Sequence, residues 1–174
     1  MSEKNTVISF YKFVNWGGIS KRKKELESFC KERDILGTII LANEGINGTI
    51  SGNDENIKEV VKFLKSDPNL EDLNPKYSHA SGETFGRMKV KIKKEIVTMG
   101  VNGINPSEIT GEHIKDEKWN ELINDPDTLV IDTRNQYEYS IGTFKNAINP
   151  KTDSFREFPK WIDDHLEELT TDKK

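Results

Sequence analysis

The order of strand and helix patterns in residues 1–99 constrains the fold of this chain more than any other feature. Short segments rich in β-branched and aromatic residues predict strands, and apolar residues at three- and four-residue spacing predict helices. The resulting order is β-α-β-β-α-β, the split βαβ or ferredoxin-like pattern, with helices on one face of an antiparallel sheet. We therefore expect an α+β fold with strands 7–13, 35–42, 45–51 and 87–97 and helices 20–33 and 54–65.

Local signals predict where the two helices begin and end. Ser20 is a candidate N-cap of the first helix, and Asn53 or Asp54 of the second, because such side chains accept hydrogen bonds from the free N–H groups of a first turn. Pro68 ends the second helix, since proline has no N–H to donate. Residues 76–79 are expected to be extended.

Residues 107–174 predict a second domain, joined to the first by a linker over residues 100–106. Its clearest pattern is an apolar strand at 129–132 that runs into a short helix rich in Glu and Tyr. About 70 residues with one evident strand cannot cover both faces of a parallel sheet, so we expect a partial domain. The other predicted helices are 108–114, 118–124 and 155–169, the last with Phe158, Ile162 and Leu166 inward.

The composition argues against a membrane or secreted protein. Charged residues make up 32% of the 174 residues and hydrophobic residues 33%. No apolar run approaches the roughly 18 residues of a membrane helix, and no apolar segment of a signal peptide follows Met1. Cys30 is the one cysteine, which rules out an internal disulfide and is typical of a reducing compartment. We therefore expect a cytoplasmic protein with no membrane partner and leave its oligomeric state open.

The predicted strand 87–97 concentrates positive charge. Alternation places four cations on one side of it: Arg87, Lys89, Lys91 and Lys93. The residues up to 105 hold 17 basic and 14 acidic side chains, and those beyond hold 9 and 16. Two interpretations remain open. The strand either faces a polyanion such as nucleic acid, or it is a solvated edge strand that lysines protect from aggregation.

Tyr11 and the turn at residues 43–48 are weaker candidates for a binding site. Phe10 and Tyr11 point to opposite faces of the first strand, so an outward ring there can stack on a base; packing of both rings is the alternative. Glu44 and Asn47 lie in the turn between two strands, where they can form a site. Asn and Gly residues also serve simply to form such turns, and we favour that role.

Cys30, Asp132 and Arg134 are expected to have structural roles. Cys30 lies on the apolar face of the first helix and is expected in the core. Asp132 and Arg134 follow the strand at 129–132, at the end where open α/β sheets bind ligands. We favour a salt bridge between them that locks the loop. The three histidines lack the spacing of metal ligands, so we expect no metal site.

Several short segments occur in the order that is seen in one enzyme family. They are Ile8–Lys12, Asn43–Gly48, Arg87–Lys91, Ile131–Asn135 with Tyr137–Tyr139, and Phe144–Ala147 with Phe155-Arg156. On these segments the chain resembles, over residues 7–169, the bacterial oxygen-dependent tRNA uridine(34) hydroxylases. The resemblance implies a ferredoxin-like (acylphosphatase-like) N-terminal domain at residues 1–99, followed by the first half of an α/β rhodanese-like domain at 107–174.

The resemblance also implies a tRNA-modifying oxidoreductase that uses molecular oxygen as co-substrate for 5-hydroxylation of the wobble uridine. It leaves any further cofactor unknown. The family's catalytic cysteine lies in a loop of the rhodanese-like domain, and no cysteine follows Cys30 here. No residue of this chain therefore matches the nucleophile, and catalysis would need a missing second half or a partner chain. The candidate tRNA-binding residues are Tyr11, Arg87, Lys89, Lys91 and Lys93.

Two other functions remain as alternatives. The chain is either a non-catalytic RNA-binding or interaction module with a vestigial rhodanese segment, or a sulfurtransferase. The single cysteine on an apolar helix face argues strongly against the second.

Overall fold

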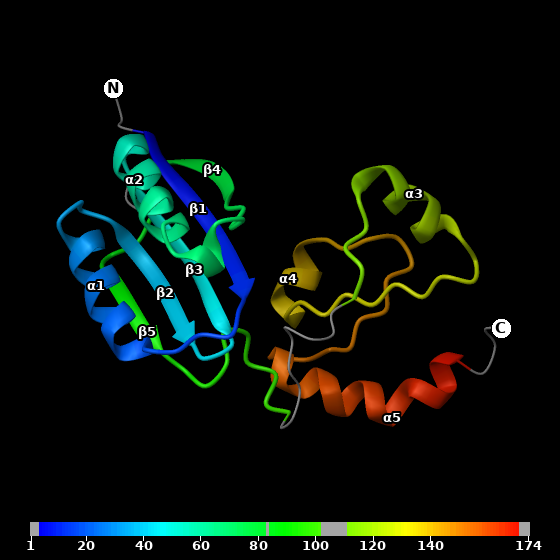
Figure 1. Ribbon diagram of the computed structural model, residues 1–174. Coiled ribbons are helices and arrows are strands. Elements are labelled where there is room, and N and C mark those ends of the chain that lie inside the picture. The colour runs from blue at the N-terminus through cyan, green and yellow to red at the C-terminus, as the bar shows by residue number, and fades with distance from the viewer. Residues whose placement is uncertain (1–3, 83, 102–110, 171–174) are drawn as a thin grey trace. The chain divides into compact units, whose positions relative to one another are not determined.

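The chain folds into two compact units, which the computed structural model in Figure 1 describes over residues 4–82, 84–101 and 111–170. The described residues up to Val97 form unit 1, and those from Thr98 onward form unit 2. None of the helices in these ranges is both long and apolar enough to cross a membrane.

Unit 1 is built on a five-stranded sheet with the strand order β4-β1-β3-β2-β5. β1 pairs antiparallel with β3 and β4, whereas β2 pairs antiparallel with β3 and parallel with β5. The ferredoxin-like fold class is thus confirmed, with β1 and β3 inside the sheet. The strands are β1 (Lys4–Phe13), β2 (Leu36–Ala42), β3 (Gly45–Gly52), β4 (Lys76–Ser81) and β5 (Met88–Ile92).

The prediction for the last strand was wrong in length and in position. We expected residues 87–97 to be the fourth strand, but that place beside β1 belongs to β4, and the basic segment adds a fifth strand at the opposite edge. The ladder ends soon after Ile92, where the N–H of Lys93 donates to the carbonyl of Leu41 at 2.9 Å. Beyond it, Glu44 of the β2–β3 turn and Asn47 of β3 bind the backbone of Ile96 and divert the chain.

Two helices cover one face of this sheet (Figure 1). α1 (Ile19–Lys31) packs over β2 and β5, and α2 (Asp54–Lys65) packs over β1 and β3. Asn53 caps α2 as predicted, since its side chain accepts a hydrogen bond from the N–H of Asn56 at 2.7 Å. Ser20 does not cap α1, because the helix begins one residue earlier and its N-cap is Gly18, in a left-handed conformation that glycine adopts without strain.

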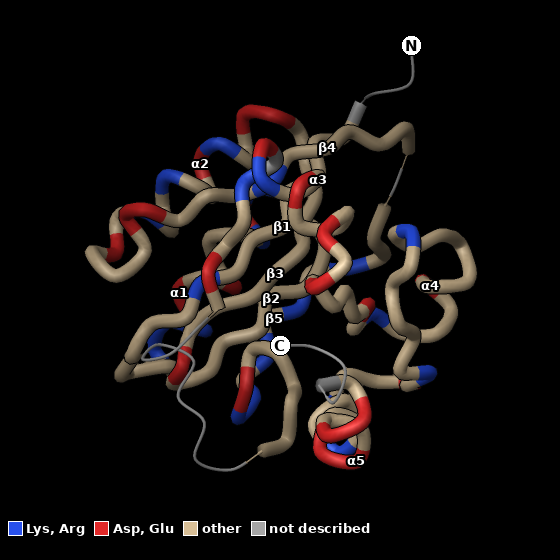
Figure 2. The backbone as a smooth tube through the Cα atoms, turned by 90° about the vertical axis from the view of Figure 1, so that its right-hand side faces the viewer, with Lys and Arg blue, Asp and Glu red and all other residues tan. Residues whose placement is uncertain are grey.

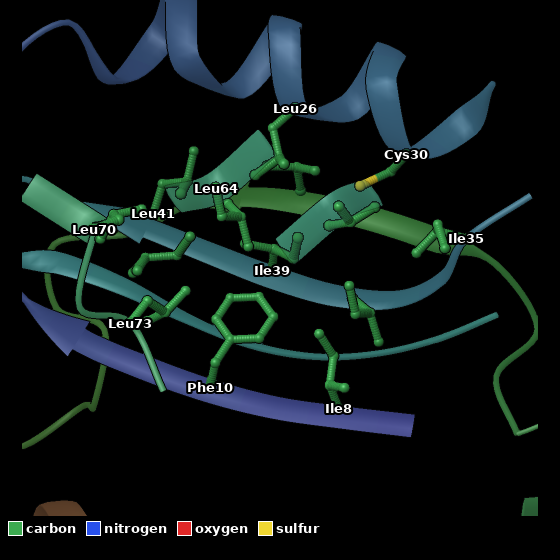
Figure 3. Close-up of a cluster of buried hydrophobic side chains, with 14 of the residues drawn as sticks. Ile8, Phe10, Leu26, Cys30, Ile35, Ile39, Leu41, Leu64, Leu70 and Leu73 are labelled. Atoms are coloured by element: carbon green, nitrogen blue, oxygen red, sulfur yellow. The ribbon is translucent and has the colours of Figure 1, made fainter. Parts of the chain in front are cut away.

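The hydrophobic core lies between these helices and the sheet (Figure 3). Ile8 and Phe10 of β1 and Ile39 of β2 point toward the helices, and Leu26 and Cys30 of α1 point toward the strands. These side chains are 0–3% exposed. Each apolar side chain of this size that leaves water stabilises the fold by about 1.5–3 kcal/mol, so this one-sided core holds unit 1 together.

Unit 2 consists of helices joined by long loops. The predicted strand at 129–132 was wrong, because it makes a single parallel bridge between Ile131 and Ile148. The predicted helix 108–114 lies largely outside the described residues, and residues 111–114 are not helical. The helices are α3 (Asp116–Asn124), α4 (Gln136–Ile141) and α5 (Phe158–Thr170), with a 3₁₀ turn η2 (Phe155–Glu157) before the last.

The described part of unit 2 contributes no residue to the buried hydrophobic core. Ile141 is 87% exposed and Tyr137 is 66% exposed. Leu166 is 51% exposed and does not face inward, which corrects the expectation for α5. Large apolar side chains left in water are typical of a surface that another element covers.

Candidate functional site

The face of the sheet that points away from α1 and α2 is the candidate functional site. Ile8 and Phe10 are buried under the helices, so alternation places Ser9 and Tyr11 on the opposite face. The strand registers extend this assignment to the neighbouring strands. We call this surface the open sheet face, defined by Ser9, Tyr11, Thr38, Thr49, Lys76, Lys89 and Lys91.

The open sheet face is positively charged. None of the five strands contains Asp or Glu, whereas β4 and β5 contribute Lys76, Lys89 and Lys91 to this face. Figure 2 colours Lys and Arg blue and Asp and Glu red along the backbone, and both colours occur on helices α1 and α2. A face to which the strands contribute lysines and no carboxylates favours an anionic ligand.

Only two of the four predicted cations, Lys89 and Lys91, lie within β5. Lys89 pairs with Thr38 and Lys91 with Ile40, so both lie on the open sheet face as the alternation predicted. Arg87 precedes the strand and, with Lys89, lines a pocket of about 350 Å³ that also contains Thr38 and Phe85. Lys93 lies beyond the strand and lines a different pocket beside the start of α1, so alternation no longer places it with the others.

Tyr11 offers an accessible aromatic ring on the same face. Its side chain is 52% exposed, and its ring lies 6.2 Å from that of Phe13 in an edge-to-face arrangement. Sequence reasoning missed Phe13, although its spacing of two residues from Tyr11 along a strand was the available signal. A half-exposed ring on a face that also carries lysines suits stacking on a nucleic-acid base.

Glu44 and Asn47 hold the chain that follows β5. A carboxylate oxygen of Glu44 accepts a hydrogen bond from the N–H of Ile96 at 2.7 Å, and the side-chain amide of Asn47 donates to the Ile96 carbonyl at 3.0 Å. The Ile96 side chain is 2% exposed. Both polar groups of a buried backbone segment are thus satisfied, which supports the structural role that we favoured for this turn.

Cys30 is buried in the core, and burial raises the pKa of its thiol to about 12, with Arg33 opposing this shift only in part. A thiol with this pKa is almost fully protonated at neutral pH and is a poor nucleophile. This geometry supports the core role that we predicted for Cys30.

We expect the native chain to resist a thiol-reactive dye at mildly alkaline pH and to react fully once denaturant is added. The physical reason is that the dye needs an accessible thiolate, and folding removes both access and charge. The measurement is the labelling rate with and without denaturant. A Cys30→Ala variant, which should remain unlabelled in both conditions, is the control. Rapid labelling of the native wild-type chain would contradict a core role.

Asp132 and Arg134 form a polar cluster in unit 2. The Arg134 guanidinium donates to both carboxylate oxygens of Asp132, at 2.9 and 2.5 Å, and also to the carbonyl of Gly142 at 2.7 Å. The hydroxyl of Thr143 donates to the same carboxylate at 2.8 Å. These hydrogen bonds hold the pKa of the Asp132 carboxyl well below its usual range, and those from Arg134 have the largest effect. Since the carboxylate is occupied by neighbouring donors, the geometry supports a loop-locking role.

We expect Asp132→Asn to destabilise unit 2 by about 2 kcal/mol at neutral pH, because it removes charge-assisted hydrogen bonds from a carboxylate. The folded-state pKa lies below the unfolded value of about 3.9, so the carboxylate stabilises fully above roughly pH 5 and loses this effect as the pH falls. The free energies of unfolding of the variant and the wild type should therefore become equal in acid. Urea unfolding followed by Trp119 and Trp161 fluorescence, with Trp16→Phe in both proteins, measures the difference. A difference in unfolding free energy that stayed constant with pH would contradict the stabilising role of the Asp132 carboxylate.

Sequence reasoning did not find the hydroxyl side chains of the open sheet face or Lys76. Ser9, Thr38 and Thr49 come together through the registers of three strands, and no local pattern reveals such an alignment. Among the residues that the structure describes, no three His, Cys, Asp or Glu side chains cluster as metal ligands would.

Two family models match this chain. The model described as the UPF0176 acylphosphatase like domain matches residues 5–96, and that of the Rhodanese-like domain matches residues 115–174. The solved structure "BlrP1 BLUF" is similar over 53% of this chain and 65% of its own, with 14% identity and a TM-score of 0.44, which is too low to carry an inference.

Curated relatives cover nearly the whole chain. A protein of Bartonella quintana named tRNA uridine(34) hydroxylase is 50% identical over 99% of this chain and 57% of its own length. A protein of Acaryochloris marina with the same name is 51% identical over 96% of this chain and 54% of its own. The chain therefore spans about half the length of the curated relatives it matches.

Proposed function

The chain belongs to the family of the UPF0176 acylphosphatase-like domain, and from this premise we propose that it is the N-terminal portion of a tRNA uridine(34) hydroxylase. The observation that carries the proposal is the identity of about half of all residues, along almost the entire chain, with two proteins of that name. The basic open sheet face independently supports a nucleic-acid substrate.

Each part of the chain has a role in this proposal. The acylphosphatase-like domain, residues 1–99, binds tRNA through Arg87, Lys89 and Lys91, with Tyr11 stacking on a base. We keep the expected linker at 100–106, most of which lies outside the described residues, between this domain and the partial rhodanese-like domain. We include Lys93 only as a peripheral contact, because it lies beyond the strand.

The chemistry belongs to the part of the relatives that this chain does not span. By family resemblance, that part supplies the reactive cysteine, and molecular oxygen is the co-substrate in 5-hydroxylation of the wobble uridine. Within this chain, Asp132 and Arg134 support the loop of the rhodanese-like domain. Glu44 and Asn47 hold the backbone of Ile96 beside the open sheet face. The exposed side chains of Tyr137, Ile141 and Phe144 support a surface that the rest of such a domain covers. A cytoplasmic location follows from a tRNA substrate.

A non-catalytic RNA-binding module is the second candidate. One observation favours it: the chain holds a single cysteine, which is buried and poorly nucleophilic. Sequencing the gene through and beyond codon 174 separates the two candidates. A reading frame that continues into a strand and a cysteine-bearing loop supports the enzyme, and a stop codon favours the module or a split enzyme.

Binding of tRNA tests the proposal directly. Purified chain is titrated into labelled tRNA at several salt concentrations, and the logarithm of the association constant is plotted against that of the salt concentration. We expect a straight line with a negative slope, because each contacted phosphate releases counterions. Failure to bind tRNA at low salt would overturn the proposed role of this part of the chain.

A further inference from the structure

Three hydroxyl groups form a line across the centre of the open sheet face. The registers pair Ser9 of β1 with Thr49 of β3, and Thr49 with Thr38 of β2. The hydroxyls of Ser9 and Thr49 lie 3.1 Å apart and share a hydrogen bond. Ser9 is exposed, and Thr38 and Thr49 are half-buried, so a ligand can reach this line. We call Ser9, Thr49 and Thr38 the hydroxyl row.

A lysine extends the hydroxyl row at each end. Lys76 of β4 pairs with Ser9, and Lys89 of β5 pairs with Thr38. The two lysines therefore lie on the two edge strands of the sheet, about 19 Å apart for strands spaced by about 4.8 Å. No strand residue offers a carboxylate to pair with them. Charge complementarity thus favours an extended anion that crosses the strands. It disfavours an apolar protein surface as the ligand.

We propose that one single-stranded segment of RNA crosses the open sheet face, with its phosphates on Lys76 and Lys89 and its ribose 2′-hydroxyls on the hydroxyl row. This inference rests on the proposed function and adds that the acylphosphatase-like domain distinguishes RNA from DNA. Serine and threonine hydroxyls both donate and accept, as the 2′-hydroxyl does, so the two kinds of group can bind each other. Deoxyribose has no such group, whereas the lysines contact the phosphates of either polymer.

Oligouridylate and oligodeoxyuridylate of equal length test the inference, because they differ only in the 2′-hydroxyl. We expect the wild-type chain to prefer the RNA. The variant Ser9→Ala/Thr38→Val/Thr49→Val should lower the RNA-over-DNA affinity ratio by about tenfold or more, through weaker RNA binding with unchanged DNA binding. The variant Lys76→Ala/Lys89→Ala should weaken both polymers alike and reduce the salt slope by about 1.4, since each single-strand phosphate contact contributes about 0.7.

The variant Lys24→Ala/Lys62→Ala is the matched control, because it removes two exposed lysines of the helices and should change neither polymer's affinity. Far-ultraviolet circular dichroism checks that every variant folds. Equal wild-type affinity for both polymers, or an RNA-over-DNA ratio that the hydroxyl variant leaves unchanged, overturns the inference. Binding of tRNA without binding of oligouridylate overturns it while the proposed function stands, and binding of neither RNA overturns both.

Discussion

Replacing Arg87, Lys89 and Lys91 together by alanine is expected to lower the affinity of this chain for tRNA by about a hundredfold at moderate salt. Lys89 and Lys91 lie on a face to which no strand contributes a carboxylate, and Arg87 lines the adjoining pocket with Lys89. If each cation neutralises one phosphate, losing all three costs about 3 kcal/mol and reduces the salt slope by roughly 2 to 3. Electrophoretic or fluorescence titration across a salt series measures both quantities.

The control for this prediction removes the same charge from the other side of unit 1. Lys24, Lys31 and Lys62 are exposed on α1 and α2, and their triple alanine variant should keep its tRNA affinity within a few-fold. Equal losses in both variants would mean that only net charge matters. An unchanged affinity and salt slope in the β5 variant would show that the basic strand protects a sheet edge and is not the footprint of RNA.

The elements with strong local patterns could be predicted from the sequence. β1 alternates cleanly enough to place Phe10 in the core and Tyr11 outside it, and α2 combines an Asn53 cap with a single apolar face. The α+β class and the ferredoxin-like order followed from such segments. Their local preferences agree with the tertiary fold, which is the condition under which sequence patterns are reliable.

The elements that could not be predicted depend on interactions with residues that are distant in the sequence. The basic segment keeps its alternation past Ile92, yet Glu44 and Asn47 bind Ile96 from about 50 residues away and end the strand early. β4 (Lys76–Ser81) contains no large aliphatic residue, so only its pairing with β1 makes it a strand. In unit 2, apolar residues predicted a strand at 129–132, but a strand needs a ladder, and one bridge does not form one.

The candidate site also combines residues that a local pattern predicts with residues that only the tertiary fold brings together. Alternation along one strand was enough to group Lys89 with Lys91 on one face. The hydroxyl row depends on three registers at once, and no periodicity within a single segment carries that information. Polar residues on central strands are therefore the signal to examine when a sheet face is expected to bind RNA.

Gly45→Ala is expected to unfold unit 1, with a loss of stability above about 4 kcal/mol. Gly45 begins β3 at a φ of 148°, and a Cβ at this position would lie 2.1 Å from the carbonyl oxygen of Lys12. That oxygen belongs to the backbone of β1, so it cannot move away without breaking the β1–β3 ladder at the centre of the sheet. An alanine must therefore strain its own dihedral angles or separate two central strands.

Urea unfolding followed by circular dichroism measures this effect, and tRNA binding should be lost with the fold because the open sheet face depends on the same ladder. Gly17→Ala is the matched control, since a Cβ there meets no atom within 4 Å and the residue has no left-handed conformation. Its stability should stay within about 0.5 kcal/mol of the wild type. A Gly45→Ala variant as stable as Gly17→Ala would mean that β1 and β3 can separate at this end without cost, and the open sheet face would then lack the rigid centre that our proposal for RNA binding requires.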